Sequence, residues 1–411
     1  MFFGGSQKAY CALANDSVQT HHLDSVVSLS LLTCQAGQEA YSLYGHTAIH
    51  YVNADKGLDI AVNYGMFNFQ KPHFVLRFIF GLTDYEMGIQ PFDYFCASYA
   101  YERRGIIEQQ LNLTPEEKRL ICQAIEENYR PENREYRYNI FYDNCTTRAR
   151  DMLLLPFLNN QETGIKVTIP RQDNGPSFRE LTHKCTEGRP WAALGNDLLL
   201  GLKADRPTSV SEQQFLPFNL MADFDSATVT RQGKQAEKLV AEKRVLIPMF
   251  DNPVEKEFPL SPTACALLLA LVIVAVSLIE HRKQKIFWLF DLVLLLLIGA
   301  AGLVLTAMIF SQHPTVNLNL QILLLNPLAI IMLWPVVRQE RKGKFHGFWS
   351  VYAICLLLFF LGNIVQCYAE GTNILALSLL VRCMVRIRNR NNQNTQNNRN
   401  IRTIRQNVNR K

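Results

Sequence analysis

The sequence predicts an α+β domain outside the cytoplasm, followed by an all-α bundle of transmembrane helices. Short stretches of β-branched and aromatic residues and one amphipathic helix pattern fill the first 260 residues. The chain becomes strongly apolar after Pro262, and its end is basic and rich in asparagine. We therefore expect four segments: an N-terminal signal segment over 1–22, a soluble domain over 23–260, a bundle over 261–385 and a basic tail over 386–411.

The soluble domain should contain a small antiparallel sheet with helices packed against it. Strands are expected over three apolar, β-branched stretches: Val26–Thr33, Thr47–Val52 and Ile60–Tyr64. Thr114, with Pro115 after it and Glu117 three positions on, forms a capping box with proline in the first helical turn. A helix should therefore begin there and run to about Tyr129.

Five apolar segments after Pro262 are candidate membrane spans, since roughly 20 apolar residues cross a bilayer. They are Thr263–Ile279, Ile286–Phe310, Leu318–Val337, Gly347–Tyr368 and Asn373–Val385. The fifth is the shortest and contains Arg382, whose long side chain we expect to reach back to the membrane surface.

Basic residues follow the first, third and fifth of these spans, whereas the loops over 311–317 and 366–373 contain no Lys or Arg. The positive-inside rule then predicts a multi-pass protein with the soluble domain outside and the tail in the cytoplasm. Such a topology requires export. Ala12-Leu13-Ala14 has the form of a signal-peptidase site, but the segment before it is short, so we expect a signal peptide truncated by a late start codon.

The formal net charge of +6 comes from the tail, because nine Lys and Arg residues and no acid lie after residue 381. The rest of the chain is therefore slightly acidic, which argues against a nucleic-acid-binding core. The tail has almost no apolar residues to bury, so we predict that it is disordered. Anionic lipid is its favoured partner and RNA the less favoured one.

Ten cysteines occur without a C-x-x-C pair or zinc-like spacing, so we expect neither a structural metal nor a cofactor. Whether Cys34, Cys96, Cys122 or Cys185 form disulfides is left open.

Two segments about a hundred residues apart suggest chemistry: 44–48 (YGHTA) and 142–148 (YDNCTTR). Asp143 or Asn144 should cap a helix that ends near Pro156, which places Cys145 in the first turn. Free backbone N–H groups and the helix dipole favour a thiolate there. His46 would be its base, although a lone histidine and a lone cysteine are more often structural.

Several neighbours are further candidates for orienting groups or for binding substrate. Tyr44 and Asn63 could orient His46, and Arg148 could form a surface ion pair or bind an anionic headgroup. Asp143 and Asn144 are better explained as caps that also tune the thiol. His313 lies in the loop between the second and third spans, on the same side of the membrane as the soluble domain.

These residues resemble the Lnb-type bacterial lipoprotein N-acyltransferases, whose periplasmic domain was formerly a domain of unknown function. The similarity covers residues 28–382. It rests on the strings 45–48 (GHTA), 63–65 (NYG) and 142–148, together with the downstream stretch 191–217 and the membrane bundle. The His-before-Cys order also resembles permuted papain-like or NlpC/P60-like folds, which is a likeness of fold alone.

The resemblance implies a cysteine-dependent acyltransferase in the bacterial inner membrane. An acyl chain would pass from a phospholipid to Cys145 as a thioester, and then to the N-terminal amine of a diacylglyceryl-cysteine lipoprotein. His46 would be the acid and base, without a cofactor or nucleic acid. Acyl transfer to an amine needs a site that excludes water, and the backbone N–H of Cys145 or Thr146 could donate to the oxyanion.

Two alternatives remain open at this point. The same Cys–His pair could belong to a membrane-anchored cysteine peptidase or amidase that acts on cell-envelope peptides. The chain could also be a non-catalytic envelope sensor or scaffold, in which Cys145 is a small buried residue.

Overall fold

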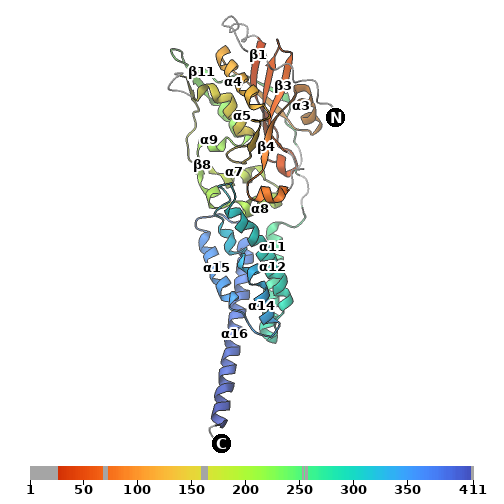
Figure 1. Ribbon diagram of the computed structural model, residues 1–411, viewed down its shortest axis with the longest axis vertical. Coiled ribbons are helices and arrows are strands. Elements are labelled where there is room, and N and C mark those ends of the chain that lie inside the picture. Colours follow the sequence, from red (N-terminus) through yellow and green to blue (C-terminus); the bar gives the residue numbers. More distant parts are fainter. Residues whose placement is uncertain (1–25, 68–72, 159–164, 252–253, 255–257, 409–411) are drawn as a thin grey trace. The chain divides into compact units, whose positions relative to one another are not determined.

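The computed structural model describes residues 26–67, 73–158, 165–251, 254 and 258–408, so the predicted signal segment lies outside it. The chain divides into two compact units (Figure 1). The first is an α+β domain that ends at Glu255 and omits the segment Thr182–Arg206. That segment belongs to the second, helical unit, although it was predicted to lie in the soluble domain over 23–260.

The first unit is built on a seven-stranded antiparallel sheet in the order β12-β5-β1-β2-β3-β4-β6. Its strands are β1 Val27–Cys34, β2 His46–Asn53, β3 Leu58–Phe67, β4 Asp84–Pro91, β5 Ile106–Leu111, β6 Glu135–Arg137 and β12 Val240–Ile247. The three predicted strands are confirmed as β1, β2 and β3. The sheet is larger than predicted because strands such as β12, with Glu242, Lys243 and Arg244 in its middle, lack an apolar pattern and are held by pairing with β5.

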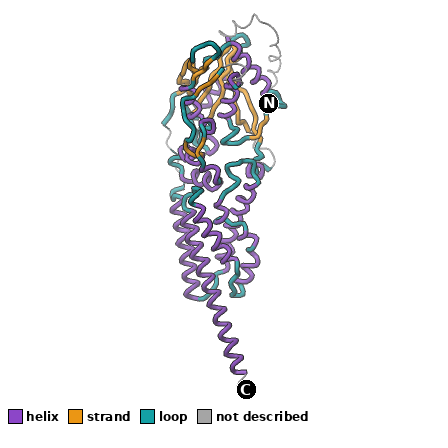
Figure 2. The backbone as a smooth tube through the Cα atoms, turned by 90° about the vertical axis from the view of Figure 1, so that its left-hand side faces the viewer, coloured by secondary structure: helices purple, strands orange, loops and turns teal. Residues whose placement is uncertain are grey.

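Helices cover both faces of this sheet (Figure 2). On one face α4 (Pro115–Asn128), α5 (Cys145–Leu154) and α10 (Pro217–Ser226) contribute Ile121, Leu153 and Leu220 to a core with alternate residues of β1, β2 and β3. On the other face α3 (Phe92–Tyr101) packs Phe95 and Tyr99 over the opposite set of strand residues. Each fully buried side chain of this kind contributes about 1.5–3 kcal/mol.

The capping box predicted for α4 is confirmed. The Glu117 backbone N–H donates to Thr114 Oγ1 at 3.3 Å, and the Thr114 N–H donates to Glu117 Oε2 at 2.8 Å. Short elements complete this unit: α2 Phe74–Ile79, α9 Val210–Gln213, β7 Lys166–Thr168, β8 Gly175–Ser177, β9 Pro207–Thr208, β10 Thr228–Thr230, β11 Glu237–Lys238, and the 3₁₀ turns η1 Ala40–Ser42 and η2 Leu155–Phe157. Helix α7 (Phe178–Cys185) begins in the first unit and ends in the second.

The second unit contains α11 Pro262–Lys283, α12 Trp288–Ile309, α13 Leu328–Ile331, α14 Leu333–Glu340, α15 Phe348–Gly362 and α16 Thr372–Val408. Within the described residues, α11 and α12 are long and apolar enough to cross a membrane. The predicted third span is broken instead. The helical stretch Leu320–Ile331 and helix α14 meet at an angle of 68°.

The break follows from proline and glycine. Pro335 has no backbone N–H to donate to the carbonyl of Ile331, so one continuous helix is not favoured across this point. Gly299 and Gly302 of α12 face the broken segment closely. A Cβ on Gly299 would lie 2.4 Å from the backbone nitrogen of Ile330, so only glycine allows this approach.

The C-terminal tail differs from the prediction of disorder from residue 386, since α16 continues to Val408. No glycine or proline interrupts the sequence after Thr372, and extending a helix that is already packed adds one hydrogen bond per residue. The boundary also moves, because Arg386 and Asn389 are buried. Arg382 is fully buried in ion pairs and does not reach toward the surface.

Polar side chains attach the segment 182–206 to the bundle. This segment contains α8 (Pro190–Leu199) and the 3₁₀ turn η3 (Leu202–Asp205). Gln321, in the 3₁₀ turn η4 (Leu320–Leu323), donates to the Asp197 carbonyl at 2.7 Å, and Asn319 donates to the Leu198 carbonyl at 2.8 Å. Gly201 donates its N–H to the Thr315 carbonyl, so backbone and side chains together hold the segment in place.

His50 connects three strands of the large sheet through two carboxylates. Its Nδ1 lies 2.6 Å from Glu108 Oε1 on β5, its Nε2 lies 2.8 Å from Asp59 Oδ1 on β3, and its ring stacks on Phe92. Burial lowers the pKa of His50, but hydrogen bonds to the two carboxylates outweigh it and the net direction is upward. Burial raises the pKa of Glu108, but the hydrogen bond and the charge of His50 outweigh it, so the net direction is downward.

We expect Glu108→Gln to destabilise the protein more than the matched change Asp59→Asn. The side chain of Glu108 is 9% exposed and that of Asp59 is 63% exposed, so solvent screens only the second pair strongly. A charged hydrogen bond of this kind is worth about 1.5–3 kcal/mol. The measurement is thermal unfolding of the full-length protein in detergent.

The difference should depend on pH in a defined direction. The contribution of protonated His50 is complete below its unfolded pKa, about 6.5, and disappears as pH rises through the raised folded value. The Glu108 contribution disappears as pH falls through its lowered value. The destabilisation by Glu108→Gln should thus be larger at about pH 6 than at about pH 9. Equal losses at both values would contradict a charged His50.

Candidate active site

Asn144 organises the start of α5. Its Oδ1 accepts hydrogen bonds from the backbone N–H groups of Thr146 and Thr147, both at 2.9 Å, and the Asn144 N–H donates to Thr147 Oγ1 at 2.8 Å. Its Nδ2 donates to the carbonyls of Ile140 and Phe215 at 2.8 and 2.9 Å. The predicted cap is therefore confirmed as Asn144, and it joins the helix to two neighbouring segments.

Cys145 is the first residue of α5, as predicted, and is half-buried. The helix ends at Leu154, just before Pro156. Gly65 lies beside the cysteine at an irregularity of β3, with φ of 86°. A Cβ at Gly65 would lie 3.7 Å from the Cys145 Cβ, in a backbone conformation that side chains disfavour, so glycine leaves the nucleophile uncrowded.

His46 is the first residue of β2, after Gly45 with φ of 77°. A Cβ at Gly45 would lie 2.9 Å from the Cys34 carbonyl oxygen, so the turn requires glycine. His46 Nε2 lies 3.0 Å from Asn63 Oδ1. When Nε2 carries the proton and donates it to Asn63, Nδ1 is left for the Cys145 thiol. The hydrogen bond to Asn63 thus holds one ring nitrogen of His46, and a role for Asn63 in orienting the base stays a prediction.

The electrostatics favour a thiolate. Burial by itself raises the pKa of Cys145, but the charge of His46 and hydrogen bonds from His46, from the Thr47 backbone N–H and from Thr146 lower it to about 7. Burial lowers the pKa of His46, whereas the charge of Cys145 and hydrogen bonds to Cys145 and Asn63 raise it above its usual value. The pKa of Cys145 is thus lowered and that of His46 is raised, as an ion pair of thiolate and imidazolium requires.

Arg148 pairs with Asp143 through two contacts, Nε–Oδ1 at 2.6 Å and Nη2–Oδ2 at 2.8 Å, and its guanidinium lies 3.8 Å from the centre of the Tyr136 ring. Of the two roles predicted for Arg148, the structure therefore shows the ion pair. Headgroup binding by Arg148 stays a prediction. Tyr44 lies in the turn before His46, and His313 belongs to the second unit, so a role for either in the site also stays a prediction.

Sequence reasoning missed Tyr136, on β6. Its hydroxyl is buried and donates to no acceptor among the described residues, although a hydrogen bond from the Gly65 backbone to the phenol oxygen opposes the rise in the pKa of Tyr136 on burial. It lies 3.9 Å from where a Cβ of Gly65 would be, and that same Cβ position is 3.7 Å from Cys145 Cβ. A buried O–H group that has no acceptor and lies near a nucleophile is a potential hydrogen-bond donor to a substrate. Nothing in the sequence singles out this tyrosine among fifteen.

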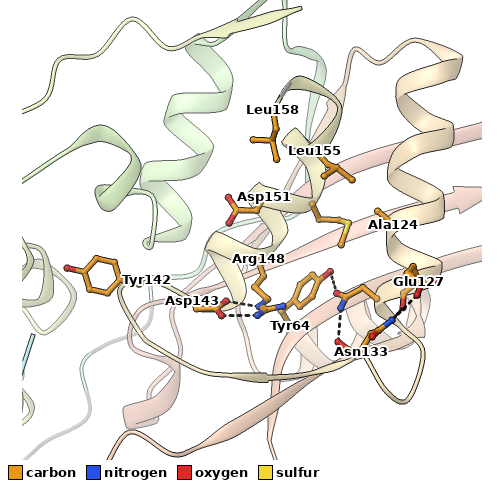
Figure 3. A pocket seen from close by; sticks show the side chains of 12 residues that line it. Tyr64, Ala124, Glu127, Asn133, Tyr142, Asp143, Arg148, Asp151, Leu155 and Leu158 are labelled. Carbon is orange, nitrogen blue, oxygen red and sulfur yellow. Dashed lines mark hydrogen bonds and ion pairs between the residues drawn. The ribbon is translucent and has the colours of Figure 1, made fainter. Parts of the chain in front are cut away.

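A cavity of about 670 Å³ lies between α4 and α5 (Figure 3). The Asp143–Arg148 pair and Tyr64 lie on one side of it, and the exposed side chains of Leu155 and Leu158 lie on the other. Neither Cys145 nor His46 lines this cavity.

The described cysteines are all free thiols, and no group of His, Cys, Asp and Glu side chains within the described ranges is arranged to hold a metal ion. The residues that come together are Cys145, His46 and Asn63, with Thr47 and Thr146 beside the sulfur. Such a set can perform nucleophilic acyl chemistry at neutral pH.

Two family models match the chain. The Lnb N-terminal periplasmic domain matches residues 15–171, and the Lnb transmembrane domain matches residues 253–394. Together they cover most of the sequence and both units. The comparisons with curated proteins and with solved structures gave no match.

The alkylation of Cys145 by iodoacetamide should rise through a midpoint near pH 7, because the thiolate is the reactive form. In His46→Ala the midpoint should move upward, since burial remains and the opposing charge is gone. Peptide mass mapping gives the rate at each cysteine. Cys185 is an internal control, because burial raises its pKa to about 11. An unchanged midpoint in His46→Ala would show that His46 does not lower the pKa of Cys145.

Proposed function

We propose, from the premise that this chain belongs to the Lnb family, that it is a cysteine-dependent membrane acyltransferase. The family makes it a membrane protein with an N-terminal periplasmic domain. The proposed reaction moves an acyl chain from a phospholipid to the N-terminal amine of a diacylglyceryl-cysteine lipoprotein. The observation that carries the proposal is the Cys145–His46–Asn63 arrangement, with a thiol pKa of about 7, in a domain attached to the membrane.

In the first half of the reaction the Cys145 thiolate attacks the ester carbonyl of the phospholipid. The carbonyl carbon to ester oxygen bond breaks, a carbon–sulfur bond forms, and the imidazolium of His46 gives its proton to the departing lysophospholipid oxygen. Asn63 holds the ring in the orientation that this transfer requires.

In the second half the free amine of the lipoprotein attacks the thioester carbonyl. Neutral His46 accepts a proton from the amine as the amide bond forms, and the thiolate leaves. The cycle returns to the ion pair of thiolate and imidazolium. Water must be kept from the thioester, and a site at the surface of a lipid bilayer favours lipid-borne acceptors over water.

Both halves place negative charge on the carbonyl oxygen, so hydrogen-bond donors are required. The Thr146 N–H is an unsuitable donor, contrary to the first expectation, because it already donates to Asn144 Oδ1. The Cys145 N–H at the helix start remains a candidate. The buried Tyr136 hydroxyl is the second donor that we assign to this role.

The same three residues could also serve a cysteine peptidase or amidase, so the substrate distinguishes the two functions. An acyl donor in the bilayer is favoured by the second unit, which is larger than the single helix that anchoring requires. The proposed topology is multi-pass, with the C-terminal end of α16 in the cytoplasm.

Incubation of purified full-length protein with a defined diacyl phospholipid and no acceptor should give a mass gain of one acyl chain at Cys145. Intact-mass spectrometry and peptide mapping measure it, and hydroxylamine should remove it because thioesters are labile to this reagent. The adduct should be absent in Cys145→Ser, which keeps the size of the side chain. A folded protein with a reactive thiol and no adduct would exclude the acyltransferase and leave the peptidase.

Tyr136→Phe should slow adduct formation by about 10-fold to 1,000-fold, the range for loss of one oxyanion donor. Its stability should change little, because the Tyr136 hydroxyl donates to no acceptor among the described residues. Tyr64→Phe is the matched control. The Tyr64 hydroxyl donates to Asn128 Oδ1 at 2.9 Å, so this variant should lose stability and keep its rate. Equal rates in both variants would remove Tyr136 from the site.

A further inference from the structure

Five charged side chains are buried together in the membrane unit: Glu280, Asp291, Glu340, Arg382 and Arg386. None is more than 2% exposed. They come from the last turn of α11, the first turn of α12, the last residue of α14 and the middle of α16. These helix ends lie at the same end of the bundle. Ionisable groups at such depth are costly and commonly mark a function.

Asp291 is the best-satisfied carboxylate of the cluster. Arg382 Nε donates to its Oδ1 at 2.6 Å, and Arg386 Nη2 donates to its Oδ2. Glu280 is the second, with Oε1 3.2 Å from Arg386 Nη2 and Oε2 3.4 Å from Arg382 Nη1. The two guanidinium groups are therefore shared between two carboxylates.

Glu340 is the third carboxyl, and it is poorly matched. Its Oε1 accepts from Trp349 Nε1 at 3.0 Å, but the nearest guanidinium nitrogen, on Arg386, is 3.9 Å away. Its Oε2 is buried without a hydrogen-bond partner in the described part of the chain. The remaining close neighbour is Asp291, which as a carboxylate repels a second negative charge.

The charge count is unbalanced when every group is ionised. Three carboxylates face two guanidinium groups, which leaves one net negative charge in an interior with low dielectric. An unpaired buried charge costs several kcal/mol, and a carboxyl in this position usually binds a proton instead. Glu340 is the carboxyl with the least cationic compensation, so the proton belongs there.

Several polar atoms of the cluster are buried without a hydrogen-bond partner among the described residues. Within the described residues, the donors without a hydrogen-bond acceptor are Arg382 Nη2, Arg386 Nε and Arg386 Nη1, and the acceptors without a hydrogen-bond donor are Glu280 Oε2 and Glu340 Oε2. Glu280 Oε2 is within ion-pair distance of Arg382 Nη1 but not in hydrogen-bond geometry. A proton on Glu340 allows its carboxyl to donate a hydrogen bond to Asp291 instead of repelling it. A water molecule, which both donates and accepts, is the ligand that suits the other unpartnered atoms.

Other titratable or charged groups lie around the cluster, and none of those described supplies a third cation to Glu340. On α11, His281 Nδ1 bonds to Asn389 Oδ1 at 2.9 Å. The Arg341 guanidinium lies over the ring of Trp288 at 5.1 Å. His346 and Arg390 are close enough for their charges to interact.

We propose that Glu340 forms a proton-binding site at this end of the bundle, with Asp291, Glu280, Arg382, Arg386 and Trp349 as its walls. Its ligands are one exchangeable proton and water. The site holds α11, α12, α14, α15 and α16 together as a neutral cluster, and loss of the proton introduces a repulsive charge against Asp291. The proposal goes beyond the acyltransferase and does not rest on it. In the proposed topology the proton exchanges with the cytoplasm.

The test is infrared spectroscopy of the full-length protein in lipid nanodiscs at neutral pH. The wild type should show the carbonyl band of one protonated carboxyl, shifted in D₂O, and Glu340→Gln should lose that band while remaining folded. Glu370→Gln is the matched control, because Glu370 is an exposed carboxylate elsewhere in the same unit. It should keep the band. A wild type without the band, or a Glu340→Gln variant that keeps it, would overturn the proposal.

A second measurement does not require the variant to fold. Trp349 donates to Glu340, so the tryptophan emission of the wild type should change as pH rises and the proton leaves. Thermal stability should fall as pH rises from the unfolded pKa of Glu, about 4.3, to the pH at which the emission changes, because over that interval the folded state binds one more proton than the unfolded state. Trp349→Phe should keep the stability change and lose the emission change. Emission and stability that are both constant between about pH 5 and pH 10 would contradict a proton on Glu340.

Discussion

The candidate site depends on the cap that Asn144 forms at the start of α5. One side chain amide accepts from two backbone N–H groups of the helix and donates to the carbonyls of Ile140 and Phe215. The cap therefore sets where the helix begins and how it lies against its surroundings. Cys145 gains the first position of the helix as a result. A helix that began one residue later would turn the thiol away from His46 by about 100°.

Two strands and one helix contribute the residues that meet at the sulfur. His46 comes from a central strand, and Asn63 from the neighbouring strand, with Asn63 paired opposite Ala48 two residues beyond the histidine. Because side chains alternate along strands, His46 and Asn63 lie on the same face. Cys145 comes from the start of α5, a helix that packs on one face of that sheet. Gly45 and Gly65 both have positive φ, and they allow the strands and the helix to approach closely.

The two buried charge clusters differ in how an imbalance of charge is relieved. His50 with its two carboxylates is partly open to solvent at Asp59, so water relieves an imbalance there. The cluster of Glu280, Asp291 and Glu340 has no exposed member. An imbalance there must be relieved inside the cluster, by a proton or by water.

Local patterns in the sequence determined much of the site and of the fold class. The cap, the capping box of α4, the three central strands, the change to apolar helices, and Cys145 and His46 as a pair were all readable, because each depends on neighbouring residues or on a recognisable string. Tertiary structure alone decided the rest. Tyr136 reaches Gly65 across the sheet, and the burial of Arg382 and Arg386 against α11 and α12 extended the bundle beyond residue 385. The physical reason is that these contacts join residues distant in the chain, whose charges and hydroxyls acquire partners only after packing.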